Sequence, residues 1–159
     1  MKSLINSYSD RVNQRLDSCL PIADGPGSTL LEAMRYSVFN GGKRIRPLLC
    51  FAAADAVGKV SESTSTVAAS IEMIHAYSLI HDDLPAMDND DYRRGKLTVH
   101  KKFDEATAVL AGDMFQVLSV KTLVDSKHLS ANQKVEAIQM LSKANGLEGL
   151  IAGQSLDIY

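Results

Sequence analysis

The chain has 159 residues, of which 45% are hydrophobic and 23% charged, and its formal net charge is −2. This size and composition indicate one ordinary folded domain and disfavour disorder. The charge is too evenly balanced for a nucleic-acid-binding surface, so we expect no nucleic-acid partner. The longest apolar run, residues 48–54, is too short to span a bilayer, and we expect no membrane insertion.

The N-terminal residues 1–20 mix charged with apolar side chains and lack the apolar core of a secretory signal. Apolar residues at three- and four-residue spacing predict a first helix over residues 2–20. A loop rich in proline and glycine follows at residues 21–28. Thr29 and Glu32 have the spacing of a capping box, which predicts the start of a second helix.

Gly41 and Gly42 are expected to end this second helix. Pro47 suits the first turn of a third helix over residues 48–57, which is apolar enough to be buried on most sides. A polar stretch at residues 61–66 separates it from a longer helix that ends near residue 84.

Asp104 is placed to cap a further helix. Ser130 and Gln133 repeat the capping-box spacing ahead of the last helix, which continues to the end of the chain. We find no strand-like alternation of useful length. The sequence therefore predicts an all-α fold of about six antiparallel helices.

The two cysteines, Cys19 and Cys50, are too few for a disulfide framework. They indicate reduced thiols and a cytoplasmic protein.

An acidic cluster follows the fourth helix. Five aspartates lie between residues 82 and 91: Asp82, Asp83, Asp88, Asp90 and Asp91. Such a run repels itself unless it is solvated or neutralised by cations. Mg²⁺ is the natural neutraliser, because it prefers one or two carboxylates together with the phosphates of a substrate. A solvated helix end is the alternative, while an EF-hand lacks its glycine and glutamate at the required positions.

Three basic residues, Arg93, Arg94 and Lys96, come directly after this acidic cluster. Guanidinium groups beside metal-binding carboxylates suit a diphosphate, which needs both cations and bidentate donors. Because Pro85 should end the helix, Asp88 can reach the same metal as Asp82 only if the chain folds back after the proline.

A second basic cluster, NGGKRIRP, occupies residues 40–47. Its two glycines free the backbone, and Lys43, Arg44 and Arg46 precede the start of a helix, where backbone amides favour an anion. An ordinary basic turn is the alternative reading. Neither this segment nor His75, seven residues before Asp82 on the same helix face, identifies a site by itself.

Four segments together resemble the trans-prenyl diphosphate synthases, most closely the bacterial farnesyl and geranyl diphosphate synthases. They are GGKRIRP (41–47), IHAYSLIHDDLPAMDNDDYRRG (74–95), AGD (111–113) and GQSLD (153–157). The resemblance covers essentially the whole chain. It implies an isoprenoid-synthase fold, with residues 1–159 as the N-terminal part of a single domain that is usually homodimeric.

The resemblance also implies a reaction: an allylic diphosphate (dimethylallyl or geranyl) condenses with isopentenyl diphosphate to give geranyl or farnesyl diphosphate. It assigns Mg²⁺ binding to Asp82 and Asp88, with Asp83 in support, and the allylic diphosphate to Arg93. It assigns isopentenyl diphosphate to four residues: Lys43, Arg46, His75 and Arg94. Gln154 and Asp157 are expected near the metals on the allylic side.

Product length is assigned to the helix ahead of the aspartates. Tyr77, five residues before Asp82, lies about 7.5 Å down a helix from it. By resemblance Tyr77, with its neighbour Ser78, closes the floor of the elongation cavity near fifteen carbons. An ordinary packed aromatic is the alternative for Tyr77.

The chain departs from the family pattern because a second aspartate-rich motif is absent. We therefore expect a piece of a prenyltransferase that is inactive by itself. Two other functions compete: a non-catalytic partner subunit of a synthase and a terpene cyclase. The intact aspartates argue against the first, and the GGKRIRP segment argues against the second.

Overall fold

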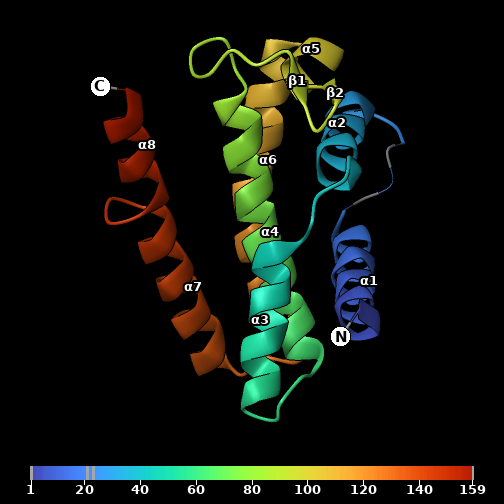
Figure 1. Ribbon diagram of the computed structural model, residues 1–159, viewed down its shortest axis with the longest axis vertical. Helices are drawn as coiled ribbons and strands as arrows, with labels where there is room; N and C mark the ends of the chain where they lie inside the picture. Colours follow the sequence, from blue (N-terminus) through green and yellow to red (C-terminus); the bar gives the residue numbers. More distant parts are fainter. Residues whose placement is uncertain (1, 21, 23, 159) are drawn as a thin grey trace.

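A computed structural model describes residues 2–20, 22 and 24–158, and these form helices and one small hairpin (Figure 1). The all-α prediction is confirmed. The helices are Lys2–Cys19 (α1), Ser28–Phe39 (α2), Ile45–Ala56 (α3), Glu62–Asp82 (α4), Val99–Lys102 (α5), Glu105–Val124 (α6), Ala131–Asn145 (α7) and Leu150–Ile158 (α8). The strands are Tyr92–Arg93 (β1) and Lys96–Leu97 (β2). Pro21 and Ala23 of the predicted loop lie outside the described residues.

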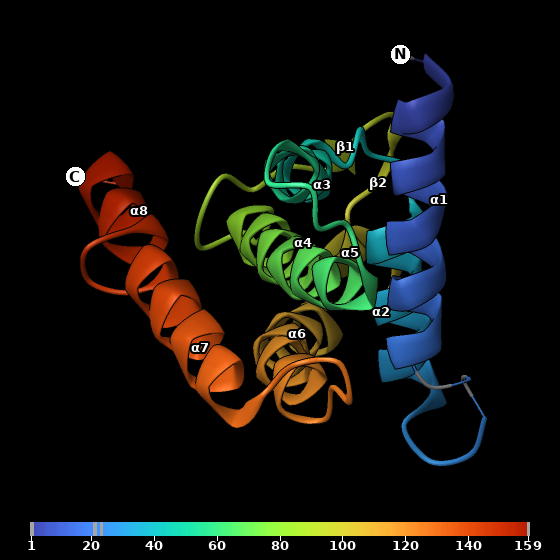
Figure 2. The same cartoon turned by 90° about the horizontal axis from the view of Figure 1, so that it is seen from below.

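Helices α4 and α6 form the centre of the protein and make its most extensive helix–helix contact. Helices α1 and α2 lie on one side of this pair and α7 and α8 on the other, while α3 packs on the face of α4 that is turned away from α6, as Figure 2 shows. Helix α4 contacts five other helices: α1, α2, α3, α6 and α7.

Small residues allow α4 and α6 to approach closely. Ser70 and Ser119 are both buried, and each hydroxyl lies 3.1 Å from the other residue's carbonyl oxygen. Their hydroxyl oxygens are 2.8 Å apart. These bonds satisfy polar groups that would be costly to bury alone. The core also contains large, fully buried apolar side chains such as Phe51 and Phe115.

Gly112 of the AGD segment makes room for a histidine of α4. A Cβ atom on Gly112 would lie 2.1 Å from Nε2 of His81. The same ring nitrogen lies 3.0 Å from the carbonyl oxygen of Val109, and the ring packs edge-on against Tyr77. The glycine is therefore explained by packing between α4 and α6.

Several predicted helix boundaries are wrong. Helix α2 begins at Ser28 after Gly27, which has φ +85° and makes no side-chain cap, so the capping box of Thr29 and Glu32 does not form the start. Helix α4 begins at Glu62 behind a capping box formed by Ser61 and Thr64. The polar stretch at residues 61–66 therefore starts the helix instead of separating two helices.

Helix α3 is less buried than its composition predicts. Pro47 does lie in its first turn, but the helix begins two residues earlier at Ile45. Only Pro47 and Phe51 are buried, while Leu49 is 64% exposed. The prediction of burial on most sides is wrong, because α3 packs mainly through one face against α4 and α1.

The caps at Asp104 and at Ser130 with Gln133 are confirmed. The last helix does not continue unbroken to the end of the chain. It ends at Asn145, and a turn in which the amide of Gly149 donates to the carbonyl of Gly146 leads into α8.

The hairpin of β1 and β2 was not predicted, because two-residue strands are too short to show alternation. Its strands pair antiparallel across Arg94 and Gly95, with φ values of +55° and +76°. Two successive positive φ values are typical of a tight hairpin turn.

Helix α6 alone among the described helices is long and apolar enough, by length and composition, to cross a membrane. The same features are found in core helices of soluble proteins, and α6 packs against α4, α2 and α5.

Replacing Gly112 by alanine should destabilise the protein by about 1–3 kcal/mol, because the new methyl group overlaps the His81 ring. Urea unfolding measures this. Gly153→Ala is the matched control, because its Cβ has no neighbour within 4 Å and alanine favours a helix. Equal stability of Gly112→Ala and wild type would contradict the packing role.

Candidate functional site

The acidic cluster is assembled by a turn after α4. The helix ends at Asp82, and the amide of Asp88 donates to the carbonyl oxygen of Asp82 at 2.9 Å. The amides of Met87 and Asn89 both donate to the carbonyl oxygen of Leu84, at 2.9 and 3.1 Å. The chain thus folds back after Pro85, which is the condition for Asp82 and Asp88 to act together.

Asp82 lies where a cation would be favoured. Burial raises the pKa of its carboxyl group, and the negative charge of Asp88 raises it further. Gln154 of α8 donates a hydrogen bond to one carboxylate oxygen of Asp82. The positive charge of Arg93 offsets part of this effect, and two carboxylates that still repel each other suit a hard divalent cation such as Mg²⁺. Among the described residues no group of three potential metal ligands comes together.

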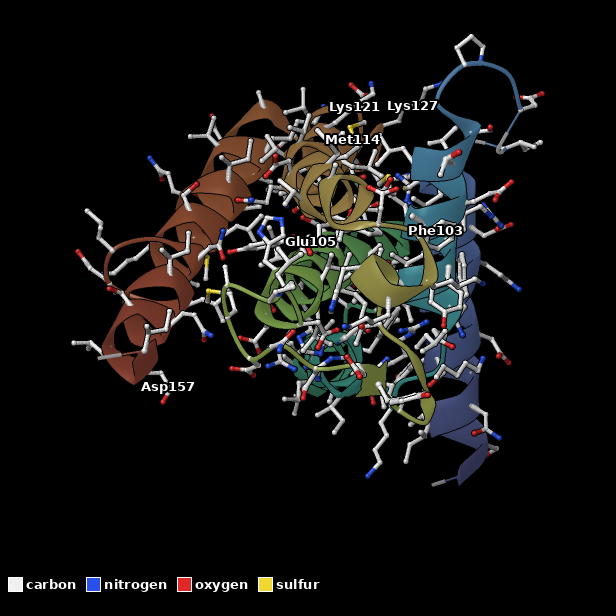
Figure 3. The ribbon with its side chains drawn as sticks, turned by 90° about the horizontal axis from the view of Figure 1, so that it is seen from above. Phe103, Glu105, Met114, Lys121, Lys127 and Asp157 are labelled. Carbon is white, nitrogen blue, oxygen red and sulfur yellow. The ribbon has the colours of Figure 1, made fainter. Side chains whose placement is uncertain are left out.

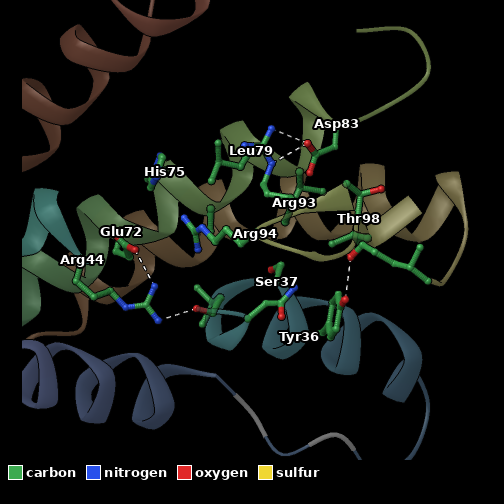
Figure 4. Close-up of a pocket in the computed structure, with 16 residues that line it drawn as sticks. Tyr36, Ser37, Arg44, Glu72, His75, Leu79, Asp83, Arg93, Arg94 and Thr98 are labelled. Atoms are coloured by element: carbon green, nitrogen blue, oxygen red, sulfur yellow. Dashed lines mark hydrogen bonds and ion pairs between the residues drawn. The ribbon is translucent and has the colours of Figure 1, made fainter. Parts of the chain in front are cut away.

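Asp83 has a different partner from Asp82. It is 3% exposed, and its Oδ1 accepts hydrogen bonds from Nε of Arg93 at 2.7 Å and Nη2 at 2.6 Å (Figure 4). Asp90 lies 3.8 Å from the same Nη2. This pairing attaches the hairpin to the end of α4 and fixes the guanidinium of Arg93 beside the acidic cluster.

Arg44 does not contribute its charge to an anion site. It has φ +50°, is 7% exposed, and its Nη1 donates to Oε1 of Glu72 at 2.9 Å. It also donates to Oδ1 of Asn13 at 2.9 Å and to the carbonyl of Val38 at 2.7 Å. The sequence placed Arg44 among three cations facing an anion, and this is wrong because the ion pair with Glu72 buries it (Figure 4).

The other basic residues share one cavity, which the paired Arg44 and Glu72 also line. It measures about 650 Å³ and lies between the 40–46 segment, α4 and the hairpin; its basic lining consists of Lys43, Arg44, Arg46, His75, Arg94 and Lys96. Nη1 of Arg46 lies 3.3 Å from Nε2 of His75. The structure therefore brings together the four residues predicted for isopentenyl diphosphate. Lys96 lines the same cavity, although the family resemblance gave it no role in binding isopentenyl diphosphate.

His75 is neutral at physiological pH. Burial lowers the pKa of its imidazole to about 4, and the positive charges of Arg46, Arg94, Arg93 and Arg44 contribute. A neutral ring can accept a hydrogen bond from Arg46.

A second cavity, of about 760 Å³, lies between α4, α6 and α8 and connects the acidic and basic parts. Its lining includes Asp82, Gln154, His75, Arg46 and Tyr77. A third, of about 570 Å³ and mostly apolar, lies between α4 and α7 and shares His75, Arg46 and Ser78 with the second. The second and third cavities therefore adjoin along α4.

Tyr77 and Ser78 both lie at these cavities. The hydroxyl of Tyr77 donates to Oδ1 of Asn145 at 2.7 Å, which links α4 to α7. Ser78 donates to the carbonyl oxygen of His75 at 2.9 Å. Asn145 had no signal in the sequence, because its role depends on how α7 packs.

Asp157 lies apart from the other predicted residues. It is exposed near the end of α8, and its carboxylate points away from the protein (Figure 3). Gln154, one turn earlier, is the residue of this segment that contacts Asp82.

These features define a helical protein in which a pair of carboxylates suited to Mg²⁺ and a set of cations suited to phosphate face connected cavities. A family model described as polyprenyl synthetase matches residues 28–159. The chain belongs to this family, which confirms the resemblance seen in the motifs.

The relatives include a farnesyl diphosphate synthase of Haemophilus influenzae, 46% identical over 97% of this chain and 52% of that protein. The large subunit 1 of a chloroplastic heterodimeric geranylgeranyl pyrophosphate synthase of Arabidopsis thaliana is 48% identical over 98% of this chain and 42% of that protein. The crystal structure of an FPP/GFPP synthase from Zymomonas mobilis has a TM-score of 0.94 and 44% identity, covering 99% of this chain and 57% of that one. The chain thus spans about half the length of the curated relatives it matches.

Because the pKa of His75 is lower in the folded protein than in the unfolded chain, acid favours unfolding. The unfolded chain takes up this proton below about pH 6.5 and the folded protein only near pH 4, so stability is lost as the pH falls between these values. We expect the free energy of unfolding to fall less between pH 7 and pH 5 in His75→Gln than in wild type. Urea unfolding at each pH measures this decrease. The control is His128→Gln, which replaces an exposed histidine and should behave like wild type. An unchanged loss in His75→Gln would contradict the assignment.

Proposed function

We propose that this chain forms the N-terminal part of a short-chain prenyltransferase that condenses dimethylallyl or geranyl diphosphate with isopentenyl diphosphate. The observation that carries the proposal is that one cavity is lined by Asp82 as well as by Arg46 and His75. A reaction between two diphosphates needs cation-binding carboxylates for one and protein cations for the other.

On the allylic side, Asp82 and Asp88 would hold Mg²⁺. When bound, Mg²⁺ neutralises the diphosphate and makes it a better leaving group. Arg93, kept in place by Asp83, has guanidinium N–H groups left to donate to the same diphosphate. The geometry of Asp83 supports a positioning role for this carboxylate.

On the isopentenyl side, Lys43, Arg46 and Arg94 would bind the diphosphate, with His75 supporting Arg46 through its ring nitrogen. The alkene of isopentenyl diphosphate attacks the allylic carbon as the carbon–diphosphate bond breaks. A proton is then lost to the departing diphosphate. No side-chain nucleophile is required, and Cys19 and Cys50 are free thiols outside these cavities.

We propose farnesyl or geranyl diphosphate as the product. The relatives' names include farnesyl and geranylgeranyl synthases, so the family alone does not select a length. Tyr77 supports a short product, because its hydroxyl is bonded to Asn145 across the space between α4 and α7.

A non-catalytic partner subunit is the second candidate. The Arabidopsis relative is named as the large subunit of a heterodimeric synthase, which favours a partner chain in that protein. Asp82 and Asp88 argue against a purely structural role here, since facing carboxylates weaken a fold unless they bind a cation.

We further propose a homodimer located in the cytoplasm. Helix α6 exposes Leu110, Val117 and Val124, which are spaced seven residues apart and so lie along one face. A continuous apolar face of this kind suits a second copy of the helix. The free thiols of Cys19 and Cys50 suit a reducing compartment.

The proposal is tested in a chimera in which these residues replace the matching segment of the Haemophilus influenzae synthase. Geranyl and isopentenyl diphosphate with Mg²⁺ should give a prenyl diphosphate. Asp82→Ala in the chimera should lower kcat at least about 100-fold, because one carboxylate ligand of the cation is lost.

Asp10→Ala, which removes an exposed carboxylate on α1, is the matched control and should leave turnover unchanged. Wild-type turnover by Asp82→Ala would refute the metal assignment. A folded chimera with no activity, beside an active parent enzyme, would refute the proposed function.

We expect no turnover from the 159 residues alone, because Leu147 and Leu156 on the α7–α8 side are 92% and 81% exposed and the cavities there are open.

Product length is tested at Tyr77 and Ser78 in the same chimera. Tyr77→Ala removes the ring and its bond to Asn145, and should lengthen the products by at least one five-carbon unit. Ser78→Phe adds a large ring at a position that lines both the second and the third cavity, and should shorten the products. Chromatography of the dephosphorylated products measures both. An unchanged profile in both variants would remove these residues from the elongation cavity.

A further inference from the structure

The guanidinium of Arg94 rests on the backbone of the Gly41–Gly42 pair. Its Nη1 donates to the carbonyl oxygen of Gly41 at 2.5 Å. A Cβ atom on Gly42 would lie 2.6 Å from Nη1, 3.0 Å from Cζ and 3.2 Å from Nη2. These distances fall below the ~3.5–4.0 Å of ordinary contact, so a side chain at this position and Arg94 compete for the same space.

The close approach is specific to Gly42. A Cβ atom on Gly41 would meet only Cδ of Arg94, at an ordinary 3.9 Å. Both glycines have positive φ values, +94° and +120°, so backbone conformation explains why each is a glycine. Only Gly42 also has the guanidinium group of Arg94 lying against it.

The backbone of Arg94 adopts a left-handed conformation that is unfavourable for residues other than glycine. It has φ +55° in the two-residue turn between β1 and β2, where glycine, asparagine and aspartate are preferred. Strain of this kind persists where the surroundings impose it, and it is concentrated at functional sites. The turn places Arg94 beside Glu72 and His75 of α4 (Figure 4).

We propose that Gly42 is a positioning residue for Arg94: the missing side chain lets the guanidinium lie flat on the loop that carries Lys43 and Arg46. The three cations then face the 650 Å³ cavity together. Only one donor of Arg94 is used by Gly41, and the others are available for a diphosphate. The inference rests on the proposed function, because it takes this cavity as the isopentenyl diphosphate site.

A double-mutant cycle in the 159-residue chain tests this inference. Isothermal titration with inorganic pyrophosphate in EDTA compares wild type, Gly42→Ala, Arg94→Ala and the double variant. Arg94→Ala should weaken binding about 10- to 100-fold, because charge-assisted hydrogen bonds are lost. Gly42→Ala should weaken it about 10-fold in wild type but less than about 2-fold in the Arg94→Ala background, because its effect passes through Arg94.

Equal losses in both backgrounds would show that Gly42 acts without Arg94 and would overturn the inference. So would undiminished binding by Gly42→Ala. Gly41→Ala is the matched control, because Gly41 lies in the same loop with φ +94° and its Cβ would meet only Cδ of Arg94, at 3.9 Å. If Gly41→Ala weakens pyrophosphate binding as much as Gly42→Ala, backbone strain in the loop is the cause and the inference is wrong.

A wild-type chain that does not bind pyrophosphate would refute the diphosphate site and the proposed function together with the inference. If wild type binds pyrophosphate but the losses of affinity caused by Gly42→Ala and Arg94→Ala are additive, only the role of Gly42 is refuted. If circular dichroism shows that Gly42→Ala does not fold, nitrogen NMR of wild type and Arg94→Ala tests the contact instead. In wild type, pyrophosphate should change the chemical shifts of Arg94 Nε and the Gly42 amide with the same Kd. The substitution Arg94→Ala should itself change the chemical shift of the Gly42 amide. Failure of either contradicts the contact.

Discussion

The arrangement of the site depends on the buried ion pair between Arg44 and Glu72. Glu72 lies in the middle of α4, and Arg44 lies in the loop that carries Lys43 and Arg46. Breaking a buried pair leaves an uncompensated charge, which costs about 3–5 kcal/mol, so the loop is held firmly on the helix. Arg46 consequently meets His75 one helical turn from Glu72.

Helix α4 is the common support for both halves of the site. Glu72 and His75 place the basic loop along it, and Asp82 and Asp83 end it. The two neighbouring aspartates act differently because successive helix residues point about 100° apart. One faces the cavity beside Gln154, and the other is buried against Arg93 and holds the hairpin. The charged groups are thus fixed relative to one another by a single rigid element.

The net charge of −2 conceals a strong local separation of charge. Asp82 and Asp88 repel each other at one end of the connected cavities, while the cations around His75 lower its pKa at the other. Arg44 and Arg93 are paired with Glu72 and Asp83, whereas Asp88, Arg46 and Arg94 form no ion pair among the described residues, as is common at sites whose ligands bring the missing charge.

The sequence by itself determined the all-α class, the caps at Asp104 and Ser130, the acidic and basic motifs and the family, because periodicity, capping residues and motif spacing are local properties. It could not show that Arg44 is buried while Arg46 is available, since both are arginines two residues apart in one loop. It also could not show that Asn145 meets Tyr77 or that Gly42 lies under Arg94, 52 residues away. Those contacts exist only after α7 and the hairpin pack against α4, and packing between distant segments leaves no periodic signal in either one.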